Sequence, residues 1–191
     1  MPTASDAFHT LLDAMASAER RLQCLDLDEP TRLEAYQWML SVLQVSVLTQ
    51  VWADPANPRF VDIVGPYLKW GGDNADAFYQ YVPVDPARTY RVTGTRGDAG
   101  YLSLTASGGP DDGRYPTRIV GSPNDRQFPV AADGSFDLWL SPEPQDGPTI
   151  VLEGDAIAVL TRDYLEHPST GRRATWAIEA MEPSAKQALT D

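Results

Sequence analysis

The spacing of apolar residues along the chain changes near residue 53. Before that point apolar residues recur at steps of three or four, which is the period of an amphipathic helix. The first such run is Phe8, Leu11, Leu12, Met15, Ala18, Leu22 and Leu25. Ser5 or Asp6 is expected to cap this helix. A second helix is expected over residues 31–52, because Asp54 and Pro55 then end it. Residues 1–53 are therefore predicted to form a helical hairpin extension.

Beyond residue 54 the pattern becomes short runs of alternating residues separated by turns, which is typical of strands. Asp133-Gly134 between two such runs indicates a hairpin. Eight or nine short strands without a long helix between them predict an antiparallel β-sandwich, jelly-roll-like, over residues 54–182. A tail follows at 183–191, and the whole chain is expected to have an α+β fold. The candidate strands are Ala77–Val82, Thr89–Thr95, Tyr101–Ser107, Thr117–Val120, Gln127–Val130, Ser135–Ser141, Thr149–Leu152, Ile157–Asp163 and Ala174–Met181.

Charge narrows the range of partners. The 191 residues include 15 Lys and Arg against 27 Asp and Glu, for a formal net charge of −12. Binding to nucleic acid or to an anionic membrane needs clustered cations, so neither partner is expected. No signal peptide and no membrane span is recognised, so a cytoplasmic location is expected. Cys24, the one cysteine, lies on the apolar side of the first predicted helix, where a buried thiol is expected.

The densest group of polar and aromatic residues runs from residue 67 to residue 81. Gly71-Gly72 permits unusual backbone angles or a close approach. Tyr79 and Tyr81 share one face of a strand, because side chains alternate. Aromatic surface with a few polar groups suits a ligand-binding wall, although a capped turn with Lys69 and Asp73 paired explains the same residues. The remaining candidates in this group are Trp70, Asn74 and Asp76.

Two further groups contain arginine, whose guanidinium suits carboxylates and phosphates. The first comprises Arg114, Tyr115, Arg118, Asn124, Asp125 and Arg126, and an ordinary turn with internal ion pairs is the alternative explanation. The second places Arg162 and Tyr164 on one face of a strand end. His9 and His167 lie far apart, so no metal site is expected, and phosphate loops and dinucleotide motifs that would indicate a cofactor are not found.

Three segments together resemble the DUF1214 domain family, a β-rich family of largely unassigned function. They are Lys69–Asn74, Thr89–Leu104 and Asp133–Ser141, and their order along the chain carries the resemblance. The resemblance covers roughly residues 54–182 and leaves the helical part uncovered. It implies a jelly-roll-like sandwich and supplies no catalytic residues.

Two functions of different classes follow from these observations. The first is a small-molecule-binding β-sandwich whose ligand is sugar-like or partly apolar, or a metal-independent enzyme of lyase, isomerase or cyclase type that uses acid/base chemistry. The catalytic candidates are Tyr79, Tyr81, Asp73 and Lys69, and the ligand-binding candidates are Trp70, Asn74, Asp76, Arg118, Arg126, Arg162 and Tyr164. The alternative is a non-enzymatic module that forms a homodimer or docks a partner through the helix at 31–52.

Overall fold

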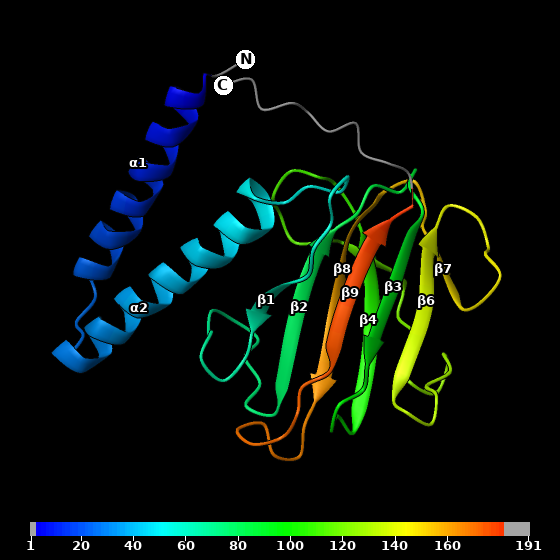
Figure 1. Ribbon diagram of the computed structural model, residues 1–191. Coiled ribbons are helices and arrows are strands. Elements are labelled where there is room, and N and C mark those ends of the chain that lie inside the picture. Colours follow the sequence, from blue (N-terminus) through cyan, green and yellow to red (C-terminus); the bar gives the residue numbers. More distant parts are fainter. Residues whose placement is uncertain (1–2, 182–191) are drawn as a thin grey trace, which may run out of the picture. The chain divides into compact units, whose positions relative to one another are not determined.

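A computed structural model, in which residues 3–181 are described, contains two N-terminal helices followed by two β-sheets (Figure 1). The predicted α+β class with a β-sandwich-like arrangement is confirmed. The chain divides into two compact units, Met1–Val42 and Leu43–Asp191. This boundary falls inside the second helix and not at residue 53, and each unit is described by itself below. Within residues 3–181, every helix is too short or too polar to cross a membrane.

The first unit contains α1 (Ala4–Gln23) and most of α2 (Glu29–Ser46). Thr3 caps α1, because its hydroxyl accepts from the Asp6 amide at 3.1 Å while the Asp6 carboxylate accepts from the Thr3 amide at 2.8 Å. The prediction of Ser5 or Asp6 as the cap is therefore wrong, since Asp6 is the other half of a capping box. Cys24 follows α1 as its C-cap and is exposed, so the expected buried thiol is also wrong.

The second predicted helix changes its winding before it ends. The α-helical part stops at Ser46, and a π-helical turn, η1 (Val47–Val51), follows. The buried Thr49 donates its hydroxyl to the Val45 carbonyl at 2.9 Å, a side-chain bond that competes with the backbone ladder. Single π turns of this kind occur often at functional sites, and this one lies in the second unit.

The second unit is built from two sheets packed face to face (Figure 1). One has five strands in the order β1-β2-β8-β4-β5, and the other has four in the order β7-β6-β3-β9. All neighbours are antiparallel except β6 and β7, which are parallel. The bounds are β1 Val61–Val64, β2 Ala77–Pro83, β3 Tyr90–Thr95, β4 Tyr101–Gly108, β5 Arg118–Gly121, β6 Ser135–Ser141, β7 Thr149–Val151, β8 Ala156–Tyr164 and β9 Thr175–Ala180.

The core between the sheets follows directly from strand alternation. On β4, Leu102 and Leu104 are fully buried, and on β6, Leu138 and Leu140 meet them from the opposite sheet. Burial of each such side chain contributes roughly 1.5–3 kcal/mol. The side chains between these positions point to the outer faces, so each sheet presents a second, differently composed surface.

Two local features differ from the expectations. No strand forms over Gln127–Val130, where a turn closed by Asn124 leaves one isolated bridge from Val130 to Phe136. Strand β1 was not predicted, because its four residues are flanked by prolines and bulged. The predicted tail at 183–191 lies outside the described residues.

The turns at Gly97 and Gly154 carry the chain from one sheet to the other, so β3 and β4, although consecutive along the chain, belong to different sheets. Gly97 has a φ of +59°, and an added Cβ would lie 2.4 Å from the Arg172 and Arg173 carbonyls. Only glycine fits this crossing without strain.

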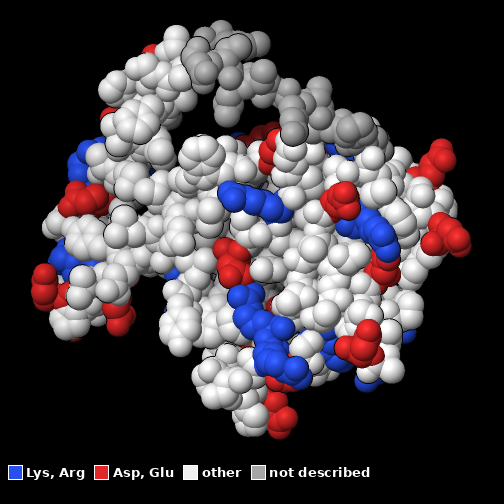
Figure 2. Space-filling view, viewed as in Figure 1, with Lys and Arg blue, Asp and Glu red and all other residues white. Residues whose placement is uncertain are grey.

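Opposite charges lie next to one another on the face of the sandwich seen in Figure 2. Arg91 pairs with Asp137, and Arg172 pairs with Asp98 at 2.7 Å. In both pairs a carboxylate balances the charge of the arginine.

Candidate functional site

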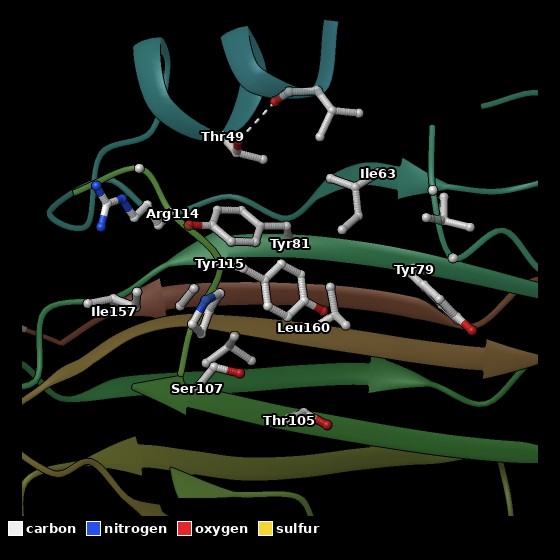
Figure 3. A pocket seen from close by; sticks show the side chains of 18 of the residues that line it. Thr49, Ile63, Tyr79, Tyr81, Thr105, Ser107, Arg114, Tyr115, Ile157 and Leu160 are labelled. Carbon is white, nitrogen blue, oxygen red and sulfur yellow. Dashed lines mark hydrogen bonds between the residues drawn. The ribbon is translucent and has the colours of Figure 1, made fainter. Parts of the chain in front are cut away.

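A cavity of about 810 Å³ lies against the outer face of the five-stranded sheet, entirely within the second unit. Its floor comes from β1, β2, β8 and β4, one wall from residues 45–50, and another from the loop at 111–117 (Figure 3). A volume of this size falls in the usual range for small-molecule pockets, about 300–1,000 Å³.

Strand alternation selects the residues of the floor. On β8, Val159 and Thr161 face the sandwich core, while Leu160 and Arg162 face the cavity. On β2, Tyr79 and Tyr81 face the same way. These two rings and Leu160 pack with the buried side chains of Val45, Ile63 and Val64, which form a second apolar cluster on this outer face.

Two phenols at this surface, Tyr81 and Tyr164, have a raised pKa. The Tyr79 and Tyr164 hydroxyls lie 3.1 Å apart, and this hydrogen bond raises the pKa of Tyr164 above its ordinary value. Burial raises the pKa of Tyr81, and the nearby Asp111 carboxylate adds to the effect. Near neutral pH Tyr81 and Tyr164 are therefore protonated phenols and not phenolate bases.

Arg162 is the central cation of the floor. Its Nη1 donates to the Thr105 hydroxyl at 2.9 Å, and its Cζ lies 5.2 Å from the Tyr79 ring centroid. Across residues 3–181, Arg162 makes no ion pair with a carboxylate. Arg162 and Tyr164 also line an adjoining shallow hollow with Tyr101, Ser103 and Ser122, so the guanidinium lies where the two depressions meet.

The other two arginines of the lining are already paired. Arg118 donates to Asp155, with one Nε–Oδ2 distance of 2.9 Å, and to Glu153 at 2.7 Å. These carboxylates raise the pKa of Arg118. Arg114 lies 3.6 Å from Asp112, and its side chain is 83% exposed. Both arginines therefore have a carboxylate partner, unlike Arg162.

The loop that contains Arg114 also contributes Tyr115, which reaches over the floor of the cavity in Figure 3. Tyr115 is 82% exposed although it belongs to the lining. An aromatic side chain in this position offers apolar surface from above to a molecule that rests on Leu160 and Tyr81.

Six residues predicted from the sequence meet at this surface. Trp70, Tyr79, Tyr81, Arg118 and Arg162 line the cavity, and Tyr164 lines the adjoining hollow. Five others do not line either depression, namely Lys69, Asp73, Asn74, Asp76 and Arg126.

The first of these, Lys69, is exposed beside the turn at Gly71-Gly72, and Asp73 closes that turn. The Asp73 Oδ1 accepts from the Trp70 amide at 3.0 Å and from the Gly71 amide at 3.2 Å. The structure thus places the acidic and basic residues of this segment in a capped turn, without the suggested Lys69–Asp73 ion pair.

The neighbouring polar residues make local contacts as well. Asn74 Oδ1 accepts from the Asp76 amide at 2.9 Å, and Asp76 itself is exposed. Arg126 is exposed beyond β5, with its amide bonded to Asn124 Oδ1 at 3.0 Å. These positions are surface turns, where such residues commonly satisfy the backbone.

Several lining residues were missed. Thr105 and Ser107 on β4 alternate with the apolar residues that fill the core, and this polar set within an apolar strand is the signal that identifies them. Thr49 and Ile63 had no such signal, because they reach the cavity from a π turn and a bulged strand.

No group of three or more His, Cys, Asp or Glu side chains suited to a metal ion occurs within residues 3–181. The site offers instead a phenol-rich apolar floor, hydroxyl groups and one guanidinium without a carboxylate partner, that of Arg162. Such an arrangement can bind and orient a small molecule through contact area, hydrogen bonds and one charge.

No protein-family profile and no curated protein matches the chain. A solved structure of an uncharacterized protein from Burkholderia cenocepacia is similar, with 29% sequence identity and a TM-score of 0.83. The similarity covers 98% of this chain and 53% of the Burkholderia chain, so this chain spans about half of that protein's length. A protein from Vibrio parahaemolyticus matches at 16% identity and a TM-score of 0.45, over 61% of this chain and 34% of the other.

Proposed function

We propose that this protein binds a small, partly apolar molecule in the cavity on the outer face of the five-stranded sheet. The observation that carries the proposal is the cavity itself, about 810 Å³ and lined by rings, hydroxyls and one unpaired guanidinium. A sheet face that served only as a surface would be expected to carry paired charges, as Arg91 and Asp137 do on the other sheet.

The lining supports a ligand with a flat or aliphatic body. Tyr79, Tyr81 and Leu160 give contact area from below, and Tyr115 gives it from the loop. Aromatic side chains contribute large contact areas with little loss of conformational freedom. A sugar-like ring or a partly apolar compound fits this description.

The acid/base variant of this function receives less support. A phenolate base needs a lowered pKa, whereas those of Tyr81 and Tyr164 are raised. Lys69 and Asp73, the other two catalytic candidates, lie outside the lining. Lyase, isomerase or cyclase chemistry therefore stays a prediction, with the Tyr79–Tyr164 pair as the remaining proton donor.

Membership of the DUF1214 family and a cytoplasmic location also stay proposals. The resemblance rests on segments that lie in the turn at 69–74, in β3 with the start of β4, and in β6. The first of these segments contributes Trp70 to the cavity, and the second contributes Tyr101 and Ser103 to the adjoining hollow. A cavity shared by longer members of that family would be a natural consequence of the resemblance.

The test is a thermal-shift screen of a neutral and acidic fragment library against two variants. Ser107→Trp fills the cavity from β4, whereas Ala177→Trp adds the same bulk at an exposed position of β9 in the other sheet. Fragments that stabilise the parent protein and Ala177→Trp are expected to lose their effect in Ser107→Trp. Fragments that bind all three proteins equally would disprove the cavity as the binding site.

A second candidate function is self-association through the helices. The observation that favours it is a set of exposed large apolar side chains on α1 and α2, namely Phe8, Leu11, Leu12, Leu33, Trp38 and Leu40. Apolar side chains in such number are typical of an interface. Sedimentation equilibrium of the full chain is expected to give the mass of a dimer. A monomer mass at 100 µM protein, on the order of the dissociation constant of the weakest specific dimers, would exclude self-association.

A further inference from the structure

We propose that the ligand of this cavity is a monoanion, with a carboxylate bound to Arg162 and an apolar body extending over Leu160 and Tyr81. This inference rests on the proposed function, since it names the chemical class that the same cavity would accept. It is drawn from the distribution of charge among the lining residues and from the position of Arg162.

The first step is the state of the Arg162 guanidinium. A guanidinium has five N–H donors, and within residues 3–181 that of Arg162 donates to one hydroxyl, that of Thr105 at 2.9 Å. The side chain is only partly buried and lines both depressions, so its remaining donors are accessible from the cavity. A carboxylate can accept two of them side by side, a geometry that strengthens and orients the contact.

The second step is the fixed position of the guanidinium. The Tyr79 ring lies under it at 5.2 Å, and Thr105 holds one edge. Tyr79 is held in turn by Tyr164, whose ring packs edge-on against Tyr101 at 5.7 Å between centroids. A preorganised cation loses less side-chain entropy when it binds an anion.

The third step limits the charge of the ligand. Arg118 and Arg114 are paired with acidic residues, and the Asp111 carboxylate also lies in the lining near Tyr81. One unpaired cation balances one negative charge. The second charge of a phosphate dianion would be repelled by a protein of net charge −12, and within residues 3–181 the lining has no second cation without a carboxylate partner. The geometry therefore favours a carboxylate over a phosphoryl group.

The fourth step orients the ligand. Arg162 and Leu160 are two positions apart on β8, and Tyr79 and Tyr81 are two apart on the adjacent strand. Two residues along a strand span about 6.6–6.8 Å, roughly the length of a naphthalene ring system. An aromatic acid with its carboxylate on Arg162 places its rings on Leu160 and Tyr81, with Asp111 beyond the uncharged end.

The experiment is isothermal titration calorimetry with two acid–amide pairs, 2-naphthoate with 2-naphthamide and 4-phenylbutyrate with 4-phenylbutanamide. The parent protein is expected to bind each acid at least about tenfold more tightly than its amide, the value of one charge-assisted pair. Arg162→Met is expected to remove that preference, and Arg162→Lys to restore part of it. Arg126→Met is the matched control, because this exposed arginine lies outside both depressions.

Salt dependence gives a second measurement on the unmodified protein. Raising NaCl from 50 to 500 mM is expected to weaken the acids severalfold and to leave the amides nearly unchanged, since only the acids form an ion pair. This arm keeps the inference testable even if Arg162→Met fails to fold.

Three outcomes would overturn the inference. These are equal affinity of each acid and its amide, acid binding that persists in Arg162→Met, and no acid binding while neutral fragments bind. In the first and third cases the Ser107→Trp comparison still decides the proposed function independently, because it needs no charged ligand.

Discussion

Two arginines, Arg91 and Arg162, lie on the outward faces of the two sheets in similar surroundings. Each guanidinium lies over an aromatic ring, at 5.8 Å from Trp139 for Arg91 and at 5.2 Å from Tyr79 for Arg162. Arg91 donates to Asp137 on the neighbouring strand, at 2.9 Å from its Nε. Arg162 meets the hydroxyl of Thr105 on its neighbouring strand instead.

The contrast shows that strand alternation and aromatic support do not by themselves make a site. A carboxylate diagonally opposite on the neighbouring strand neutralises the arginine, whereas a hydroxyl at the same kind of position holds it in place and leaves its charge available. On this view the outer face of the five-stranded sheet is a binding surface because β4 has Thr105, and not a carboxylate such as Asp137, beside the arginine.

The strongest test converts one face into the other. Thr105→Asp puts a carboxylate beside Arg162, as Asp137 lies beside Arg91. Binding of 2-naphthoate is expected to weaken by about a hundredfold or more, because the ligand loses an unpaired cation and meets a like charge. Calorimetry measures this effect. Thr105→Asn has a similar shape without the charge and is expected to lose less than about tenfold.

The next prediction concerns Asp163, which follows Arg162 on β8 and faces the opposite way, into the core. Burial raises the pKa of Asp163 to about 6, and its Oδ1 has no hydrogen-bond partner among residues 3–181. The folded protein therefore binds this proton more tightly than the unfolded chain. The contribution of Asp163 to the free energy of unfolding is fully present below about pH 4 and is lost as the pH rises to about 6.

Asp163→Asn is expected to raise the free energy of unfolding at pH 7.5 by about 2 kcal/mol, since no buried charge then has to form. Urea denaturation at pH 5 and at pH 7.5 measures the change in both proteins. The difference between variant and parent should shrink at the lower pH. A difference that is equal at both pH values would show that Asp163 is not the titrating group.

A smaller effect is expected from Tyr79→Phe. The variant removes the hydroxyl that bonds to Tyr164, so the pKa of Tyr164 should fall back toward 10.0. Stability should drop by about 1 kcal/mol, the usual value of one hydrogen bond. Spectrophotometric titration of the tyrosines measures the change in the pKa of Tyr164. Unchanged titration would mean that the two phenols are not bonded.

The smallest effect is expected on the paired face. Arg91→Met removes an ion pair whose side chains are 47% and 42% exposed, so the free energy of unfolding should change by less than about 1 kcal/mol. Affinity for 2-naphthoate should stay within twofold, roughly the scatter of calorimetry. A large loss of affinity would show that charge on the far sheet acts on the cavity, against the contrast drawn above.

Much of the architecture was predictable from the residues. The change from a three-to-four-residue period to a two-residue period predicted the helices and eight of the nine strands to within a few residues. Alternation also put Arg162 with Tyr164, and Tyr79 with Tyr81, on shared faces. These features follow from backbone geometry, which acts between near neighbours.

The site was only partly predictable for the same reason. Lys69 and Asp73 have suitable chemistry, but their own turn uses the Asp73 oxygen and leaves Lys69 in solvent. Thr105 is marked in the sequence only as a polar residue within an apolar strand, and its importance comes from the guanidinium that β4–β8 pairing places diagonally beside it.

The period of the apolar residues was therefore sufficient to establish helices, strands and their inward faces, because burial of alternate side chains is a local rule. Pairing between strands distant along the chain then assigned β3 and β4 to different sheets and brought residues 45–50, 79–81 and 160–162 to one cavity. Such long-range contacts depend on the packing of the whole core, which no short stretch of residues encodes.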